Sequence, residues 1–193
     1  MKEFPLYINS KRLYEDDAYC SHIKKLEAEN FYRWNLSLYR SDAGLHESTP
    51  WYATNYDDNN WQTVNMFSQS WGNNGLNPIG GSHWLRQDIE IPQSWNGKEA
   101  TLRLGCIVDA DSVYVNGVFV GTTSYQYPPR IYRIPAGILK SGKNNITVRI
   151  ISNGGQPGFV QEKPYKIICD NEEINLKQKW KYRLGAPMPP LRR

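Results

Sequence analysis

Apolar and polar positions alternate in the middle of the chain, and this alternation predicts β-strands. Between residues 101 and 106, large apolar residues alternate with polar or small ones, which is the period of a half-buried strand. Two further β-prone runs, 112–115 and 118–120, flank the pair Asn116-Gly117. An Asn-Gly pair is the strongest short-range signal for a hairpin, because a type I′ turn needs positive φ at both central residues. We therefore expect an antiparallel hairpin here.

The same kind of pattern recurs on both sides of this hairpin. A second turn is predicted at residues 141–145. The chain has further β-prone runs at residues 82–91, 146–151, 165–169 and 175–184. Many short strands separated by turn residues are typical of an antiparallel β-sandwich, so we predict an all-β fold.

The N-terminal part of the chain has a different period. Residues 1–12 are expected to form an extended lead-in, and residues 16–39 follow the spacing of a helix. Asp16 or Asp17 can cap its start and Gly44 can end it. Its apolar residues form one stripe, which must be buried against this sandwich or against another domain. The stripe consists of Tyr19, Ile23, Leu26, Phe31, Trp34 and Leu38.

Turn-rich segments separate these elements and suggest the domain organisation. Residues 42–71 are polar, with a short strand expected after 56–60, and a long loop is expected at 72–81. The segment 185–190 is rich in proline and is interpreted as a linker that cannot continue a sheet. We predict a lead-in and linker helix over 1–45, a sandwich domain over 46–184 and a linker toward a missing catalytic segment over 185–193.

Composition excludes several functional classes. The net charge of the 193 residues is +4, and no basic run is longer than the terminal Arg192-Arg193, which argues against nucleic-acid binding. No apolar run has membrane-spanning length, and the first ten residues show no signal-peptide core. Three widely spaced cysteines indicate neither a disulfide framework nor a metal cluster. The 13% aromatic content suits a sandwich core or a surface that faces carbohydrate.

Several segments together resemble a known domain family. Residues 84–86, 91–98, 102–105, 109–121 and 130–150 resemble the galactose-binding-like jelly roll found in family 2 glycoside hydrolases and in sialate O-acetylesterases. Two further pieces are similar to the esterases in particular, namely the glycine-rich loop N-G-G-Q-P-G-F at 153–159 and the closing W-K-Y-R-L-G-A-P-M-P-P at 180–190. The resemblance covers about residues 51–190 and implies a jelly-roll sandwich.

The esterase resemblance also implies a partner. In that family the jelly roll accompanies a hydrolase domain of the Ser-Gly-Asn-His type, which carries the nucleophile and an Asp-x-x-His pair, and the proteins are often exported or periplasmic. Residues 67–71 (F-S-Q-S-W) lack the Gly and Asn that flank that nucleophile. The resemblance therefore implies an accessory domain whose hydrolytic residues lie outside this chain.

A self-contained catalytic triad is not expected, because the histidines stand in no recognisable nucleophile or metal setting. They are His22, His46 and His83. Asp109 and Asp111 are two residues apart and share a face of a strand, where they could bind Ca²⁺ or a sugar. The plainer interpretation is that Asp111 pairs with Arg130 or Arg86. We predict no cofactor, although jelly rolls of this type often hold a structural Ca²⁺.

Two further places are candidates for a sugar site or a domain interface. Trp84 and Arg86 share a strand face, and an aromatic ring beside an arginine suits a sugar carboxylate, although an inward Trp with a snorkelling Arg explains the pair as well. In the glycine-rich loop, a close approach of the backbone to a neighbouring domain is possible, and otherwise the loop is a plain turn. Its candidate residues are Asn153, Gly154, Gly155 and Phe159.

The sequence thus predicts a non-catalytic accessory domain of a sialate O-acetylesterase-like serine esterase. The parent reaction would be deacetylation of an O-acetylated sialic acid or a related acylated sugar. Three alternatives remain open, namely a carbohydrate-binding module, the sugar-binding-like domain of a β-glycosidase, and a structural adaptor whose helix face binds a partner.

Overall fold

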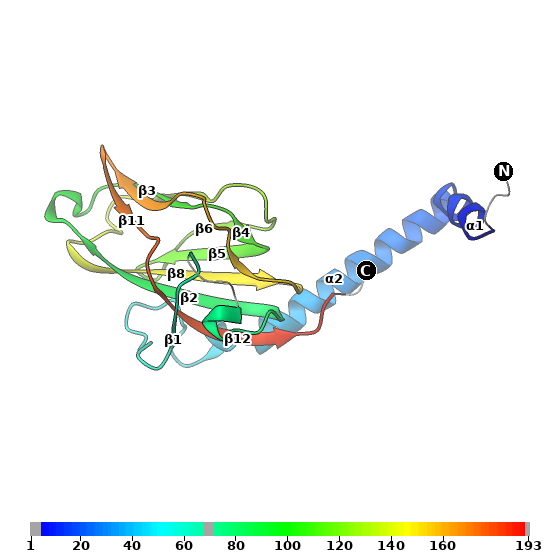
Figure 1. The fold of residues 1–193 in the computed structure, drawn as a ribbon, viewed down its shortest axis with the longest axis horizontal. Coiled ribbons are helices and arrows are strands. Elements are labelled where there is room, and N and C mark those ends of the chain that lie inside the picture. The colour runs from blue at the N-terminus through cyan, green and yellow to red at the C-terminus, as the bar shows by residue number, and fades with distance from the viewer. Residues whose placement is uncertain (1–4, 68–71, 192–193) are drawn as a thin grey trace. The chain divides into compact units, whose positions relative to one another are not determined.

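The computed structural model describes residues 5–67 and 72–191 and confirms an antiparallel β-sandwich with an N-terminal helix (Figure 1). The chain divides into two compact units. Residues 5–37 belong to a helical unit, and residues 38–190 form the sandwich unit. None of the helices in the described ranges is both long and apolar enough to cross a membrane.

The larger layer of the sandwich is a six-stranded sheet with the order β1-β12-β2-β8-β5-β6. Its strands pair antiparallel throughout. In chain order they are β1 (Gln62–Val64), β2 (Gly80–Ile91), β5 (Ala110–Val115), β6 (Val118–Thr123), β8 (Gly142–Ser152) and β12 (Trp180–Met188).

The smaller layer is a four-stranded sheet with the order β11-β10-β3-β7. Its strands are β3 (Ala100–Leu104), β7 (Ile131–Ile134), β10 (Tyr165–Cys169) and β11 (Glu172–Asn175). A two-stranded ladder of β4 (Ile107–Val108) and β9 (Gly158–Phe159) and two short 3₁₀ helices, Gly72–Asn74 and Gln93–Trp95, complete the sandwich unit.

The core lies between the two sheets and follows the alternation seen in the sequence. Leu102 and Leu104 of β3 are fully buried, whereas Thr101 and Arg103 are half-buried on the other face. They pack in one cluster with residues of the larger sheet, among them Leu85, Val113, Val115, Ile146, Val148 and Ile150. Burying these aliphatic side chains supplies the main drive for folding.

The predicted hairpin is present between β5 and β6. Asn116 has a φ of 49° and Gly117 a φ of 78°, as a type I′ turn requires. The Asn116 side chain also donates to the Ile138 carbonyl (2.8 Å) and accepts from the Asn145 backbone N–H (2.9 Å). Asparagine therefore both forms the turn and fastens it to neighbouring segments.

The helical region differs from the prediction at two points, its lead-in and its C-terminal end. Residues 5–14 are helical, as α1 (Pro5–Tyr14), so the expectation of an extended lead-in over residues 1–12 is wrong. Proline is well tolerated in a first turn, which needs no N–H donor there. The second helix, α2 (Asp17–Ser41), is capped by Asp16, whose carboxylate accepts from the Tyr19 N–H (3.0 Å).

Gly44 does not end this helix, contrary to the prediction. The helix ends at Ser41, and Asp42 caps a separate short helix, α3 (Ala43–His46), by accepting from the Gly44 N–H (3.0 Å). The apolar stripe is fully buried only at its end, at Trp34 and Leu38, whereas Ile23 is half-buried and Phe31 is 58% exposed.

Residues 185–188 were expected to leave the sheet, but they continue β12. Ala186, Pro187 and Met188 pair with Ser82, Gly81 and Gly80 of β2, after a register shift near Gly185. The neighbouring strand β1 reaches only as far as Tyr182. Beyond that point β12 has an open edge, and an edge strand tolerates a residue that lacks an N–H donor.

Candidate functional site

Trp84 and Arg86 point from β2 to the outer face of the six-stranded sheet, and both are buried. The segment 42–61, which we call the strap, covers them. Its aromatic residues Trp51 and Trp61 form one cluster with Trp84, and Tyr52 stacks on Tyr114 of β5 at a centroid distance of 4.4 Å. This face of the sheet is therefore closed by aromatic packing.

Asp42 fixes one end of the strap. Its carboxylate accepts from the Trp84 indole N–H (2.9 Å) and from Arg149 Nε of β8 (2.7 Å). Asp42 is fully buried and the Arg149 side chain is 9% exposed, so water screens this pair poorly.

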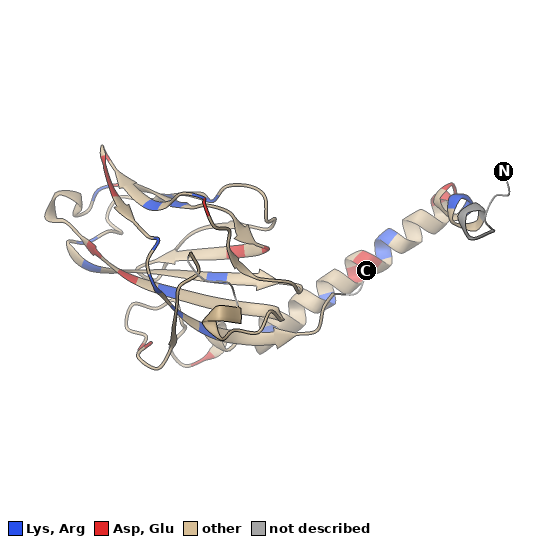
Figure 2. Cartoon of the chain, viewed as in Figure 1, with Lys and Arg blue, Asp and Glu red and all other residues tan. Residues whose placement is uncertain are grey.

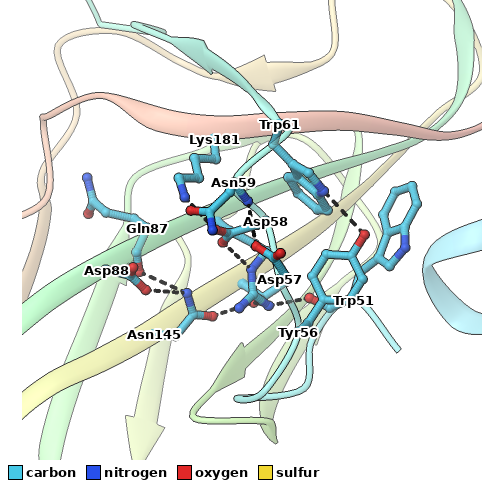
Figure 3. A network of polar contacts seen from close by, with 12 residues as sticks. Trp51, Tyr56, Asp57, Asp58, Asn59, Trp61, Gln87, Asp88, Asn145 and Lys181 are labelled. Carbon is cyan, nitrogen blue, oxygen red and sulfur yellow. Dashed lines mark hydrogen bonds and ion pairs between the residues drawn. The ribbon is translucent and has the colours of Figure 1, made fainter. Parts of the chain in front are cut away.

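Asp58 fixes the other end of the strap, as Figure 3 shows. It accepts from Arg86 Nε (2.8 Å) and forms an ion pair with Lys181 of β12. Arg86 also donates to the Thr147 hydroxyl (3.1 Å) and to the Trp51 carbonyl. Burial opposes ionisation of Asp58, but the hydrogen bonds from Lys181 and Arg86 outweigh it and hold its pKa below the usual range. Trp84 and Arg86 thus hold the strap on the sheet and present no open surface to a ligand.

Asp111 and Arg130 form the predicted ion pair, with 2.6 Å between Arg130 Nε and the Asp111 carboxylate. Both side chains are fully buried, and the Tyr132 hydroxyl donates to the same carboxylate (2.5 Å). The alternative partner, Arg86, pairs with Asp58 instead.

Asp109 lies beside the glycine-rich loop. Its carboxylate accepts from the Ser152 hydroxyl (3.0 Å) and, at 3.4 Å, from the Asn153 backbone N–H. The same hydroxyl lies 2.8 Å from the Gly154 carbonyl, so these two acceptors compete for its single proton. Asn153 and Gly155 are exposed, so the loop leaves backbone accessible at this end of the sandwich.

Phe159 is not part of that exposed surface. It is 7% exposed and packs in the core against Phe67, Tyr165 and Trp180, with centroid distances of 5.1–5.6 Å. Within residues 5–67 and 72–191, no three His, Cys, Asp or Glu side chains gather as a metal site.

The three histidines are placed in separate surroundings. His22 is exposed on α2, and His46 contacts the Tyr39 carbonyl through Nε2 (2.6 Å). His83 is fully buried, where it contacts the Tyr182 hydroxyl (2.9 Å) and the Ile79 carbonyl (3.0 Å). Burial lowers the pKa of His83 to about 4. Of the stretch 67–71, residues 68–71 lie outside the described part of the chain.

The sequence did not single out a cleft of about 250 Å³ at one end of the four-stranded sheet, which we call the β3 cleft. Its walls come from the end of β3, the β6–β7 loop, the start of β7 and the loop before β10. The lining residues are Arg103, Gly105, Cys106, Tyr127, Pro129, Arg130, Ile131, Lys163 and Pro164.

Two exposed tyrosines mark the loop over the β3 cleft. Tyr125 is 58% exposed and Tyr127 67%, and their rings meet edge to face at a centroid distance of 5.1 Å. Exposing an aromatic ring to water is unfavourable, so exposed rings that flank a concave site favour a role in binding. The run Y-Q-Y-P-P over residues 125–129 is the signal that could have found this site in the sequence.

Arg130 holds this loop in place from beneath. Its guanidinium donates to the carbonyls of Gln126 (3.1 Å) and Pro128 (2.8 Å) on one side. On the other side it donates to the carbonyls of Ile107 (2.9 Å) and Asp109 (3.0 Å). The buried Asp111–Arg130 ion pair therefore supports one wall of the β3 cleft, and the Asp109 carbonyl helps to hold the same guanidinium.

No protein-family model matches the chain, and no curated protein is similar to it. Among solved structures, a β-glucuronidase of an uncultured Clostridium species matches 48% of this chain with 20% identity and a TM-score of 0.37. The β-glucuronidase of Ruminococcus gnavus with D-glucuronic acid matches 64% with 19% identity and a TM-score of 0.37. The α-L-rhamnosidase of Streptomyces avermitilis with L-rhamnose matches 58% with 19% identity and a TM-score of 0.45.

The chain spans only a small part of these enzymes, namely 15%, 19% and 11% of their respective lengths. At this identity the similarity concerns the fold. The reactions of those enzymes are therefore not assigned to this chain.

Proposed function

We propose that the sandwich is a non-catalytic domain of a larger carbohydrate-active enzyme and binds a sugar at the β3 cleft. The observation that carries the proposal is the exposed pair Tyr125 and Tyr127 beside a concave site. An aromatic ring offers an apolar face to the C–H groups of a sugar, and its hydroxyl offers a hydrogen bond. The loop is pre-organised by Arg130, which lowers the entropy lost when a ligand binds.

Binding is measured by calorimetry and by amide chemical-shift changes with a panel of neutral and acidic monosaccharide glycosides. Tyr127→Ala is expected to weaken binding at least about tenfold, because one stacking face and its hydrogen bond are lost. The matched control is Tyr32→Ala, since Tyr32 is equally exposed, at 67%, but lies on α2. Equal affinity of wild type and Tyr127→Ala would contradict the site, and no binding of any sugar would contradict the function.

For the parent enzyme we propose a sialate O-acetylesterase-like carbohydrate esterase, in which a Ser-Gly-Asn-His-type hydrolase domain is the partner of this sandwich. The two segments that resemble the esterases, residues 153–159 and 180–190, would together form one surface on which that hydrolase domain docks. A Cβ added at Gly80 would lie 2.9 Å from the Met188 carbonyl oxygen and 3.2 Å from the Asn153 carbonyl carbon. The glycine-rich loop and the end of β12 are therefore neighbours.

The esterase proposal is tested by acetyl release from an O-acetylated sialic acid and from a generic acetyl ester. The chain alone is expected to release no acetate, because its hydrolytic residues would belong to the partner domain. Turnover that survives substitution of every serine in the stretch 67–71 and of His22 and His46 by alanine, and of the buried His83 by glutamine, would point to contamination. Turnover lost in those variants would overturn the non-catalytic assignment.

A further inference from the structure

We propose that the β3 cleft selects a sugar that carries a carboxylate, and that Arg103 and Lys163 are the residues that bind it. This inference rests on the proposed function and specifies its ligand class. The cleft lining contains three cationic residues and no acidic one. The three cations differ in whether they are available to a ligand.

Arg130 is not available. A guanidinium has five N–H donors, and Arg130 donates once to Asp111 and twice each through its two terminal nitrogens. Its charge is also balanced by the buried carboxylate of Asp111. Arg130 therefore positions the loop and does not bind the ligand.

Arg103 and Lys163 are available. Neither side chain has an ion-pair or hydrogen-bond partner among the described residues, whereas the sandwich pairs many of its other cations with carboxylates, for example Lys98, Lys143 and Lys166. Figure 2 shows that residues of both signs are interspersed along the chain. Two unpaired cations in one concave site, without a carboxylate in its lining, favour an anionic ligand.

The backbone brings these two cations to the same place. Leu102 and Leu104 point into the core, so Arg103 between them points outward from the middle of the four-stranded sheet. Lys163 comes from the loop before β10 and reaches the end of β3 at Gly105. A Cβ at Gly105 would lie 2.6 Å from Lys163 Cβ, and its φ is 51°, so glycine permits this close approach.

The chemistry of the site fits a single acidic sugar. A guanidinium binds a carboxylate through two parallel N–H donors, and an ammonium adds a point charge. Tyr127 supplies a ring on the same wall. A volume of about 250 Å³ is at the small end of ligand sites, which suits one sugar residue. Glucuronic acid and sialic acid share this chemistry, a sugar ring with a carboxylate.

The test compares methyl β-D-glucuronide, the methyl glycoside of N-acetylneuraminic acid and methyl β-D-glucoside by calorimetry at fixed ionic strength. Both acidic glycosides, or one of them, are expected to bind at least about tenfold more tightly than the glucoside. Arg103→Gln is expected to remove this preference and to leave the weak binding of the glucoside unchanged. Because the Arg103 side chain has no polar partner in the described part of the chain, its variant is expected to keep the wild-type urea midpoint.

Lys140→Gln is the matched control for Lys163→Gln. Lys140 is also exposed but lies at the opposite end of β3, where the Leu139 carbonyl accepts from the Gly97 N–H. Lys163→Gln is expected to weaken binding of the acidic glycosides about tenfold, and Lys140→Gln is expected to have no effect.

Three results would overturn the inference. Equal affinity for glucuronide and glucoside would refute the carboxylate preference and leave the sugar site standing. Displacement of the glucuronide by sulfate at equal concentration would show a site for any anion. If none of the three glycosides binds, the proposed function fails together with the inference.

Discussion

At the scale of single residues, Gly44 shows how closely the strap packs on the sheet. A Cβ at this position would overlap the indole ring of Trp84. By helix propensity alone, alanine in α3 would stabilise the protein by about 0.5–1 kcal/mol. We expect the opposite sign for Gly44→Ala, a loss of about 1–3 kcal/mol, because the buried ring has no room to move.

The free energy of unfolding from urea titration decides this sign. Gly72→Ala is the control, because no atom of the residues that the structure describes lies within 4 Å of a Cβ placed there. A Gly44→Ala variant as stable as the wild type would mean that the strap is not seated on Trp84.

His83 gives the fold a predictable pH dependence. The Ile79 carbonyl can only accept, so His83 donates through Nε2, and in the neutral ring that burial favours, Nδ1 accepts from the Tyr182 hydroxyl. The pKa of His83 is lowered from 6.5 to about 4, chiefly by burial. Between these values the unfolded chain binds a proton that the folded chain does not bind, so stability falls as the pH drops. The interval of about 2.5 pH units corresponds to roughly 3 kcal/mol.

Denaturation midpoints measured from pH 7 to pH 4 check this expectation. His83→Gln is expected to flatten the slope in that window, and His22→Gln, at an exposed position, is expected to retain it. The lowered pKa of Asp58 adds a further loss only below about pH 3.8, its ordinary value. The same slope in His83→Gln as in the wild type would assign the dependence to another group.

At the scale of elements, the strap is held by ion pairs more than by its own secondary structure. Asp58→Ala would leave Arg86, which is 2% exposed, without its carboxylate. Removing one partner of a buried pair costs about 3–5 kcal/mol of folding stability. We expect a loss near ~3 kcal/mol, at the low end of that range, because Lys181 is partly exposed and water can solvate its ammonium group. Unfolding in guanidinium chloride, followed by tryptophan fluorescence, measures this loss.

The neighbouring carboxylate provides the control for that experiment. Asp57 is exposed and only accepts from the Asn59 backbone N–H (3.0 Å), so Asp57→Ala is expected to cost less than about 1 kcal/mol. If Asp58→Ala and Asp57→Ala lower the free energy of unfolding equally, the Asp58–Arg86 ion pair contributes no more to stability than a local turn contact does.

The elements that can be predicted well are those determined by residues close together in the sequence. The hairpin at Asn116-Gly117 and the alternation of β3 depend on adjacent residues, so both could be predicted. The strap could not, because its ion pairs join residues far apart in the chain, such as Asp42 with Arg149 and Asp58 with Lys181.

The candidate site was predicted in part, for the same reason. Asp111 with Arg130 could be proposed from charge and strand position. The β3 cleft depends instead on Lys163 meeting the end of β3 at Gly105, a contact between residues 58 positions apart that no local pattern indicates.

At the scale of the whole molecule, the division into two units runs through α2. The sandwich unit begins at Leu38, which is 1% exposed, whereas Tyr19, Leu26 and Phe31 earlier in the helix are each more than 40% exposed. The sandwich has its own core and its own strap, so its stability depends little on residues before Trp34.

This division predicts different outcomes for two truncations. A chain that begins at Trp34 keeps both buried side chains of the apolar stripe and is expected to unfold within about 1 kcal/mol of the full chain. A chain that begins at Asp42 loses both Trp34 and Leu38, and the removal of the buried leucine alone costs about 2–5 kcal/mol. Urea titration of the two truncated chains beside the full chain measures both values. If the chain that begins at Trp34 is already destabilised by several kcal/mol, the two units fold as one. The exposed face of α2 then has a structural role that the boundary at Leu38 does not predict.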